Sequence, residues 1–427
     1  MKPSRIALFG LGKMGLPLAC ALANAGHAVV GVDVNAEWVA RINRKEDVLP
    51  REPGVHDLLL KTVGKNFTAT TDSDVSSFDF VILLVPTLIE ETPTGIRPDL
   101  HLVFKVAEKI GKSLRKGTVV ITECTLPPGS TEIIGSVLGR ESGLFVGKDF
   151  GMAHCPERTS SGTALRDICG QYPKIVGASD PETLEKVSDL YASINSKGVI
   201  RMPSLSAAEC VKVFEGIYRD VNIGLANELA KYCQDKGLDA FEIFQAANTQ
   251  PFCHLHNPSC GVGGHCIPYY PYFVMSEKTP LIKAARATND SMPEYAVDLL
   301  MPAKGDRVGL LGLTFRGGVK EFRKSPALDI LRVLKERGVD VFALDPLCSD
   351  QEIETFGVKP LKSYSKLDGI MVASNHAEFK MLDWKAIVPL LRKKVILDGC
   401  QGVDPDAVLA AGATYLGVGR KPGFVLK

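Results

Sequence analysis

The chain has 427 residues, more than one hydrophobic core usually holds, so two or three domains are expected. Hydrophobic residues make up 45% of it, a share typical of well-packed globular domains and not of disordered chains. Because 50 Lys and Arg stand against 49 Asp and Glu, the charge argues against a nonspecific binder of nucleic acid or membrane surfaces.

The start of the chain and its cysteines bear on where the protein works. The opening MKPSRIALFGLG has a short apolar run followed by a glycine loop, which predicts a first strand and not a signal peptide. No apolar run approaches the ~18–20 residues that span a bilayer. Eleven cysteines are scattered without a secretory signal, which indicates free thiols in a reducing cytoplasm. We therefore expect a soluble cytoplasmic protein.

Short apolar runs alternate with helix-length segments in the first third of the chain. Four of these runs predict buried strands, at Ile6–Phe9, Ala28–Val32, Phe80–Val85 and Thr118–Thr122. This rhythm is typical of a parallel sheet covered by helices on both faces.

A glycine loop follows the first of these strands. Gly10-x-Gly12-x-x-Gly15 would open a helix, and Asp33 stands at the end of the next strand. The glycines permit a tight turn, a close approach of the backbone to a pyrophosphate and close helix–strand packing, while the helix N-terminus offers amides to the phosphates. Asp33 would bind the ribose hydroxyls and repel a 2′-phosphate, which favours NAD over NADP. The alternative is a tight turn that binds no ligand.

Glu157 follows another expected strand, in the loop His154-Cys-Pro-Glu157-Arg158. Polar groups in such loops often bind ligands. Taken alone, this position favours an ordinary glutamate without a functional role.

The strand rhythm changes near residue 200, where a long helix is expected to run to about Gln234. Ser206 and Glu209 have the spacing of a capping box, so Glu209 is interpreted as the capping partner of Ser206. Lys212 lies about two turns into this helix, with Glu209 before it and Glu215 after it. Most helix lysines are solvated, and the spacing alone favours that interpretation here.

A cysteine stands in the glycine-rich segment Gly261-Val-Gly-Gly-His-Cys266. Glycines there allow a substrate to approach the backbone and leave amides free to stabilise an oxyanion, so Cys266 is a candidate nucleophile. A buried thiol beside a tight turn is the competing interpretation. Zinc binding is a third, since cysteines and histidines crowd this stretch, although without paired CxxC or HExxH spacing. The crowded residues are Cys253, His254, His256, Cys260, His265 and Cys266.

The C-terminal part repeats the pattern of the first strands. Residues 6–15 can be laid over residues 308–317, and residues 26–33 over residues 338–345, with Thr314 in place of the second glycine. The fold class is therefore α/β, with two Rossmann-like, doubly wound parallel-sheet domains joined by a central helical domain. We expect an NAD-binding domain at 1–205, a helical domain at 206–300 and a second Rossmann-like domain, which has lost its dinucleotide loop, at 301–427.

Together these segments resemble the nucleotide-sugar 6-dehydrogenases, the UDP-glucose/GDP-mannose dehydrogenase family. The resemblance covers essentially the whole chain in order, and within the family HCPER, the RDVNI–ANE helix and GVGGHCIP are most similar to the UDP-N-acetyl-D-mannosamine dehydrogenases. The motifs that carry it are GLGKMGLPLA, VPT, TECTLPPGST, HCPER, SAAECVKVFEGIYRDVNIGLANELA, GVGGHCIP, ARATNDSMP and LLGLTFRGGVKEFRKSPALDI.

The resemblance implies an activity and the residues that perform it. The activity is the NAD-dependent oxidation of a UDP-sugar at C6 to a uronic acid for polysaccharide biosynthesis, by a homodimer that pairs through the long helix and needs no metal. Cys266 is the implied nucleophile, Lys212 the catalytic lysine, Glu157 the group that positions or activates water, and Thr125 a neighbour of the nicotinamide.

Further contacts are implied in the same way. The implied cofactor contacts are Gly10, Leu11, Gly12, Met14, Gly15, Asp33, Pro86, Thr87 and Arg323. The implied substrate contacts are Glu157, Arg158, Lys212, Gly263, Arg286 and Arg316.

The sequence departs from the family pattern near the implied chemistry. Gly216 stands where an asparagine usually follows the catalytic lysine by one turn, and Tyr270 stands where an aspartate is usual. Thr249, Gln250 and Phe252 occupy a region that commonly carries an arginine. Our hypothesis is that Tyr270 fills the space that Gly216 leaves.

Several functions remain open at this level. A thiol explains how a dehydrogenase could remove four electrons, because it would hold the intermediate aldehyde as a thiohemiacetal and then as a thioester. UDP-glucose or UDP-N-acetylglucosamine could be the substrate instead. A single-step β-hydroxyacid dehydrogenase, and an inactive sensor of nucleotide sugars that retains the fold, are the alternatives from other classes.

Overall fold

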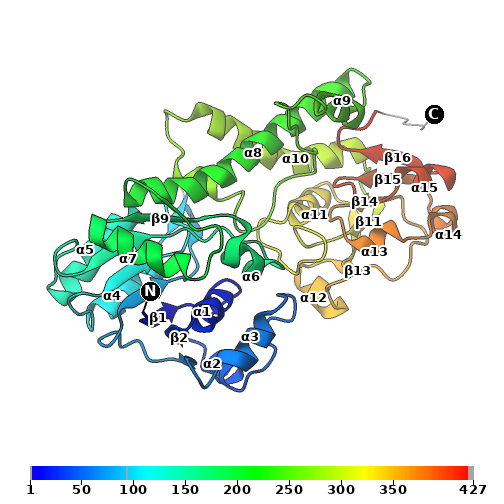
Figure 1. Ribbon diagram of the computed structural model, residues 1–427. Helices are drawn as coiled ribbons and strands as arrows, with labels where there is room; N and C mark the ends of the chain where they lie inside the picture. Colours follow the sequence, from blue (N-terminus) through cyan, green and yellow to red (C-terminus); the bar gives the residue numbers. More distant parts are fainter. Residues whose placement is uncertain (1, 93–94, 422–427) are drawn as a thin grey trace. The chain divides into compact units, whose positions relative to one another are not determined.

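A computed structural model describes residues 2–92 and 95–421 of the chain (Figure 1). It comprises two compact units, and each is described by itself. The first runs through Glu215 and takes in Tyr272–Val274. The second comprises Gly216–Pro271 and the chain from Met275 onward. The three-domain division stays a prediction, because compactness alone groups the central helices with the C-terminal sheet.

The first unit is built on an eight-stranded sheet with the order β10-β9-β8-β7-β4-β1-β2-β3. Neighbouring strands run parallel except β8 and β9, which are antiparallel. The strands are β1 (Arg5–Phe9), β2 (Ala28–Val32), β3 (Phe67–Thr70), β4 (Phe80–Leu83), β7 (Val119–Thr122), β8 (Gly151–His154), β9 (Lys174–Ala178) and β10 (Val199–Arg201). All four strands expected from the sequence are confirmed, three of them with one end shifted by one or two residues. A separate hairpin is formed by β5 (Leu88–Thr92) and β6 (Gly95–Asp99).

Side-chain alternation in this sheet supplies two cores, as a doubly wound fold requires. On β1, Ile6 and Leu8 enter the core shared with α1, α3 and α7, whereas Ala7 and Phe9 enter the core shared with α4 and α5. The helices of the unit are α1 (Gly15–Asn24), α2 (Ala36–Asn43), α3 (Val55–Thr62), α4 (His101–Gly111), α5 (Ser130–Ser142), α6 (Ala164–Arg166), the π-helical turn η1 (Asp167–Gln171) and α7 (Pro181–Ala192).

The second unit repeats this plan with a six-stranded, all-parallel sheet, in the order β13-β12-β11-β14-β15-β16. One face packs against α8, α10 and α11, and the other against α13, α14 and α15. The strands are β11 (Arg307–Leu311), β12 (Asp340–Leu344), β13 (Lys359–Pro360), β14 (Gly369–Val372), β15 (Val395–Asp398) and β16 (Thr414–Gly417). The helices after β11 are α11 (Pro326–Glu336), α12 (Asp350–Thr355), α13 (Ala377–Lys380), α14 (Trp384–Ile387), η3 (Val388–Leu390) and α15 (Pro405–Ala410).

Helices fill the sequence between the two sheets, as expected. They are α8 (Leu205–Asp235), α9 (Ala240–Ala247), the short 3-10 turn η2 (Tyr270–Phe273) and α10 (Pro280–Leu300). The division between the units falls inside α8. Its second-unit part lies close to α10, since a Cβ on Gly224 would be 3.0 Å from the carbonyl oxygen of Ala285.

The predicted capping box of α8 is wrong. The helix begins at Leu205, and the Ser204 hydroxyl accepts a hydrogen bond from the amide of Ala207 at 3.1 Å. Ser206 instead donates to Glu132 at 2.8 Å, and Glu209 is directed at a different helix. The backbone amides at the buried N-terminus of α5 have no acceptors within their own helix. Glu209 accepts hydrogen bonds from these amides and therefore does not cap its own helix.

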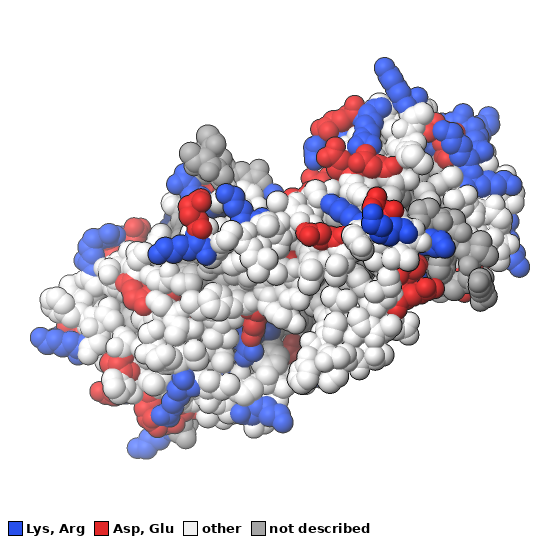
Figure 2. Space-filling view, turned by 90° about the horizontal axis from the view of Figure 1, so that it is seen from above, with Lys and Arg blue, Asp and Glu red and all other residues white. Residues whose placement is uncertain are grey.

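The surface carries both signs of charge. In the face that Figure 2 shows, Lys and Arg are interspersed with Asp and Glu, in keeping with the near-zero net charge. Among the described residues, no helix is both long enough and apolar enough to cross a membrane.

Candidate active site

The glycine loop of the first unit has the geometry of a dinucleotide-binding turn. Gly10 has a φ of +96°, and a Cβ there would lie 2.4 Å from the carbonyl oxygen of Leu84. A Cβ on Gly15 would lie 1.8 Å from the oxygen of Gly10, so α1 can approach β1 closely only with glycine at this position. A Cβ on Gly12 would meet no atom within 4 Å, and Gly12 is exposed, which leaves an open face at the N-terminus of α1. This cradle fits a pyrophosphate.

The Asp33 side chain is hydrogen-bonded to this loop. One carboxylate oxygen accepts a hydrogen bond from the Leu11 amide at 3.0 Å, and the other accepts from the Asn35 amide at 3.0 Å. The side chain is half-buried, so its charge lies beside the cradle without being sealed from a ligand. The residues present therefore fit a dinucleotide. Met14 precedes α1, and Pro86 and Thr87 lie in the loop between β4 and β5.

Three implied catalytic residues belong to the first unit. Thr125 follows β7 and Glu157 follows β8, so both stand at the carboxyl ends of neighbouring strands, where ligands of doubly wound folds bind. The Lys212 Nζ lies 3.9 Å from the Glu157 Oε2. Their side chains are only 12% and 18% exposed, so Lys212 is not a solvated helix lysine. The Glu157 carboxylate also accepts hydrogen bonds from the amide and hydroxyl of Thr159.

Arg158 is held by protein groups. Its guanidinium forms an ion pair with Glu215 at 2.5 Å and lies 4.9 Å from the ring centroid of Tyr172. The Tyr172 hydroxyl donates a hydrogen bond to the carbonyl oxygen of Arg158 at 2.5 Å. These contacts fix the loop after Glu157, and a substrate contact for Arg158 stays a prediction.

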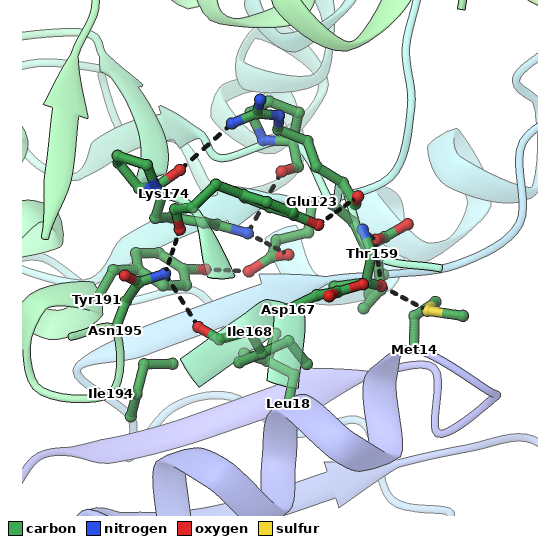
Figure 3. A pocket seen from close by; sticks show the side chains of 16 residues that line it. Met14, Leu18, Glu123, Thr159, Asp167, Ile168, Lys174, Tyr191, Ile194 and Asn195 are labelled. Carbon is green, nitrogen blue, oxygen red and sulfur yellow. Dashed lines mark hydrogen bonds and ion pairs between the residues drawn. The ribbon is translucent and has the colours of Figure 1, made fainter. Parts of the chain in front are cut away.

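A small cavity lies behind Glu157, between this loop and α1 (Figure 3). Met14 and Leu18 of α1 line one side, and Glu123, Lys174 and Tyr191 line another. The space in which a water molecule can be centred is about 20 Å³, room for roughly one ordered water.

The polar lining of the cavity is an almost completely buried ion pair. The Lys174 Nζ donates to the Glu123 carboxylate at 2.8 Å, and the Tyr191 hydroxyl donates to the other oxygen of that carboxylate. The Glu123 side chain is 2% exposed and that of Lys174 is 16% exposed. Burial raises the pKa of Glu123, and the Lys174 charge opposes that shift.

A second buried chain of polar groups starts at Glu209. Its carboxylate accepts hydrogen bonds from the amides of Gly129 and Thr131, at 2.5 and 2.8 Å, and from the Thr131 hydroxyl at 2.6 Å. The Thr131 hydroxyl lies 3.0 Å from the Thr122 hydroxyl, which lies 2.8 Å from Nδ1 of His154. Glu209 thus caps the buried N-terminus of α5. This series of hydrogen-bonded polar groups connects the segments that carry Thr125, Glu157 and Lys212. Burial raises the pKa of Glu209 to about 7 and lowers that of His154 to about 3.

The cysteine loop belongs to the second unit. A Cβ on Gly263 would lie 2.7 Å from the oxygen of Lys324, and one on Gly264 would lie 3.0 Å from the Phe315 ring. These glycines therefore let the loop pack on the segment after β11, in addition to any approach by a substrate. Cys266 is half-buried, and its hydrogen bond with His265 is the largest contribution that raises the pKa of the histidine.

Tyr270 follows Cys266 by one turn, its amide donating to the oxygen of Cys266 at 3.2 Å. Its ring packs on α8 where Gly216 has no side chain. A Cβ on Gly216 would lie 2.0 Å from Cδ2 of Tyr270. The expected juxtaposition of Tyr270 and Gly216 is confirmed.

The remaining implied contacts also belong to the second unit. Arg286 is 3% exposed and forms a buried ion pair with Asp220 of α8, so its guanidinium is engaged inside the helical packing. Arg316 and Arg323 are exposed in the segment between β11 and α11. The contact of Arg323 with cofactor phosphates stays a prediction. Among the described residues, no group of three His, Cys, Asp or Glu side chains is placed to hold a metal ion.

Comparison with known proteins gives the family. The chain matches the NAD binding domain of the UDP-glucose/GDP-mannose dehydrogenase family over residues 4–195, its central domain over 206–291 and its UDP binding domain over 309–405. The chain belongs to this family. It is an NAD-dependent UDP-sugar dehydrogenase.

Named relatives are similar over nearly their whole length. A UDP-N-acetyl-D-mannosamine dehydrogenase from Pyrococcus horikoshii is 33% identical, with 97% of this chain and 99% of the relative covered. A UDP-N-acetyl-D-glucosamine 6-dehydrogenase from Pseudomonas aeruginosa is also 33% identical, over 93% and 96% of the two chains. The solved structure of the UDP-D-ManNAc dehydrogenase from Pyrococcus horikoshii matches with a TM-score of 0.85 at 30% identity, covering 98% and 99% of the chains.

Sequence reasoning missed several groups around the site of this dehydrogenase. Glu123 directly follows β7, Lys174 belongs to β9 and Tyr191 to α7, and no spacing along the chain connects them. From the sequence, His265 is predicted only as a candidate metal ligand, although its place next to Cys266 is a signal for a partner of the thiol. The predicted capping role of Glu209 is wrong because the amides that donate to its carboxylate lie about 80 residues earlier in the chain.

Proposed function

We propose that this dehydrogenase oxidises the C6 hydroxymethyl group of UDP-N-acetyl-D-mannosamine to the carboxylate. The observation that carries the proposal is a cysteine, hydrogen-bonded to a histidine, in a chain of the NAD-dependent UDP-sugar dehydrogenase family. A dehydrogenase that stops at the aldehyde needs no nucleophile, whereas one that proceeds to the acid does. The mannosamine substrate is supported by the names of the relatives, with UDP-N-acetylglucosamine and UDP-glucose as alternatives.

The overall reaction converts one CH2OH, one water and two NAD into one carboxylate, two NADH and three protons. NAD supplies the hydride acceptor at each of the two oxidations. Between them, the Cys266 sulfur adds to the aldehyde carbon, so that the second oxidation leaves a thioester. Water then adds to the thioester carbonyl, the C–S bond breaks and the thiol of Cys266 returns.

The side chains divide this work. Lys212 would stabilise the negative charge that develops on the C6 oxygen, because a buried ammonium acts strongly in a site with little water. Glu157 would accept a proton from the hydrolytic water. Thr125 would lie beside the reacting centre. Arg316 and Arg323 would pair with the phosphates of the nucleotides, as exposed guanidinium groups commonly do.

A second copy of this chain is the proposed partner of α8. Tyr218, Leu225 and Tyr232 are 56%, 46% and 59% exposed and are spaced by seven residues, so they line up along one face of the helix. Exposed large apolar side chains in such a row mark an association surface. We place this dimer in the cytoplasm, where free thiols persist.

The ratio of NADH to sugar acid tests the function. Complete conversion of UDP-N-acetyl-D-mannosamine should form two NADH per acid, without free aldehyde accumulating. Cys266→Ser should stall after the first oxidation or trap an ester, because an alkoxide is a poorer leaving group than a thiolate. Cys253→Ser, at a half-exposed cysteine of the same segment, is the control and should keep full activity.

Three other results would contradict the proposal. One NADH per product would indicate a single-step dehydrogenase. Binding of UDP-sugars without turnover of NAD would indicate a sensor. Full activity of Cys266→Ser would give Cys266 a structural role only.

A further inference from the structure

We propose that Lys174 is a positioning residue that holds Glu157 for hydrolysis of the thioester, acting through the buried ion pair with Glu123. The inference rests on the proposed function, because it concerns the last step of that reaction. It assigns a task to the polar cluster behind the active-site loop (Figure 3).

The loop that carries Glu157 is held by backbone hydrogen bonds at the end of β7. The Cys155 amide donates to the oxygen of Thr122 at 2.9 Å, and the Glu157 amide donates to the oxygen of Glu123 at 3.1 Å. Glu123 therefore contacts Glu157 through its backbone and Lys174 through its side chain. A movement of Glu123 would be transmitted to Glu157.

Lys174 is the side chain that joins this arrangement together. Its Nζ donates to the Glu123 carboxylate at 2.8 Å and to the carbonyl oxygen of Pro156 at 3.4 Å, one residue before Glu157. The same Nζ lies 4.8 Å from the centroid of the Tyr191 ring. One buried cation thus contacts the strand end, the active-site loop and α7.

A gain in folding stability does not by itself explain the buried ion pair of Lys174 and Glu123. Burying two charges costs several kcal/mol, and apolar residues of similar volume often stabilise a fold as well or better. What a charged pair adds is a defined geometry, because its hydrogen bonds allow few orientations. That geometry is applied to the loop of Glu157, beside a cavity with room for roughly one water.

Hydrolysis is the step that depends most on this geometry. Glu157 must accept a proton from water as the water oxygen bonds to the thioester carbon and the C–S bond breaks. A displacement of about 1 Å in such a group can slow a step by about 10- to 100-fold. The two hydride transfers need no water and are expected to be less affected.

Lys174→Met tests the proposal, since it keeps the length of the side chain and removes the charge and the hydrogen bonds. In rapid mixing with UDP-sugar and NAD, we expect a burst of two NADH per active site, followed by turnover slowed by about 10- to 100-fold. Mass spectrometry should find the acyl group on Cys266 during that slow phase. Lys116→Met removes an exposed lysine paired with Asp149 and should show neither change.

Lys174→Met could also disturb folding, so Tyr191→Phe provides an independent test. It removes only the hydroxyl that donates to Glu123, and it should give a smaller burst of the same kind. Unchanged kinetics in both variants, or a slower first hydride transfer without an acyl-enzyme, would overturn the inference. If the wild-type enzyme forms fewer than two NADH per product, the proposed function itself fails.

Discussion

Asp33 serves two purposes at one position. Its carboxylate accepts the Leu11 amide, which shapes the glycine loop, and its charge stands where a cofactor ribose is expected. Removing the side chain would disturb both. A substitution that keeps the acceptor and removes the charge separates them.

Asp33→Asn is such a substitution. The wild-type enzyme should prefer NAD over NADP by at least about tenfold, or about 1.4 kcal/mol. The variant should lose about that factor, because the repulsion of the 2′-phosphate is gone while an oxygen for the Leu11 amide remains. The comparison of kcat/KM for the two cofactors measures this. Glu37→Gln, an exposed carboxylate on α2, is the control. Equal values for both cofactors in the wild-type enzyme would contradict the role of Asp33.

Glu209 should make stability depend on pH. Its pKa is about 7 in the folded protein against 4.5 for an ordinary glutamate, so the native state binds this proton more tightly than the unfolded state. Its contribution is complete below about pH 4.5 and is lost as the pH rises through about 7. A rise in the pKa from 4.5 to about 7 corresponds to a contribution on the order of 3 kcal/mol.

Glu209→Gln should remove this dependence while keeping an acceptor for the α5 amides. Thermal unfolding at pH 5, 6, 7 and 8 should show the variant gaining on the wild-type protein as the pH rises. Glu37→Gln, at an exposed glutamate of α2, reports the general effect of removing one charge. A constant difference between Glu209→Gln and wild type over this range would contradict the assignment.

At the scale of elements, α8 contains a glycine where a helix normally disfavours one. Glycine costs a helix interior about 1 kcal/mol relative to alanine. The ring of Tyr270 explains it, since any side chain at position 216 would occupy the place of that ring. The turn after Cys266 is thereby packed on α8.

Gly216→Ala should therefore destabilise the protein, although alanine is the better helix former. In a Tyr270→Asp background the same change should stabilise it, by up to about 1 kcal/mol. Urea unfolding of the four proteins completes a double-mutant cycle. Additive effects would show that Tyr270 and Gly216 do not interact. Gly216→Asn and Tyr270→Asp, alone and combined, extend the same cycle to activity.

At the scale of the whole molecule, the two sheets have diverged at one loop. Gly312 keeps the left-handed φ of Gly10, at +92°, but Thr314 closes the loop by donating to Asp345 at 3.1 Å. Asp345 also accepts from the Leu313 amide at 2.8 Å and contacts His376 at 3.2 Å. Burial would raise the pKa of Asp345, but these hydrogen bonds lower it overall. The Asp345 carboxylate, which stands where an acid would bind a ribose, is thus already engaged by groups of the protein.

The proposed dimer can be tested at the same scale. Leu225→Glu places a charge in the middle of the apolar row on α8 and should convert dimers into monomers. Light scattering after size exclusion should report half the mass. Ile243→Glu, at a 42% exposed position on α9, should leave the mass unchanged. A wild-type monomer, or a variant that stays dimeric, would contradict this surface.

The sequence by itself determined the strands, the glycine loop and the long helix, because each depends on periodicity or on residues close together in the chain. It also predicted that Gly216 and Tyr270 lie together. Both depart from the family pattern, and the ring of Tyr270 suits the space that a glycine leaves. The capping box failed for a physical reason. A buried helix end about 80 residues earlier offered Glu209 better donors than its own helix did. Only the tertiary structure could bring Glu123, Lys174 and Tyr191 together, because burial turns distant polar residues into partners.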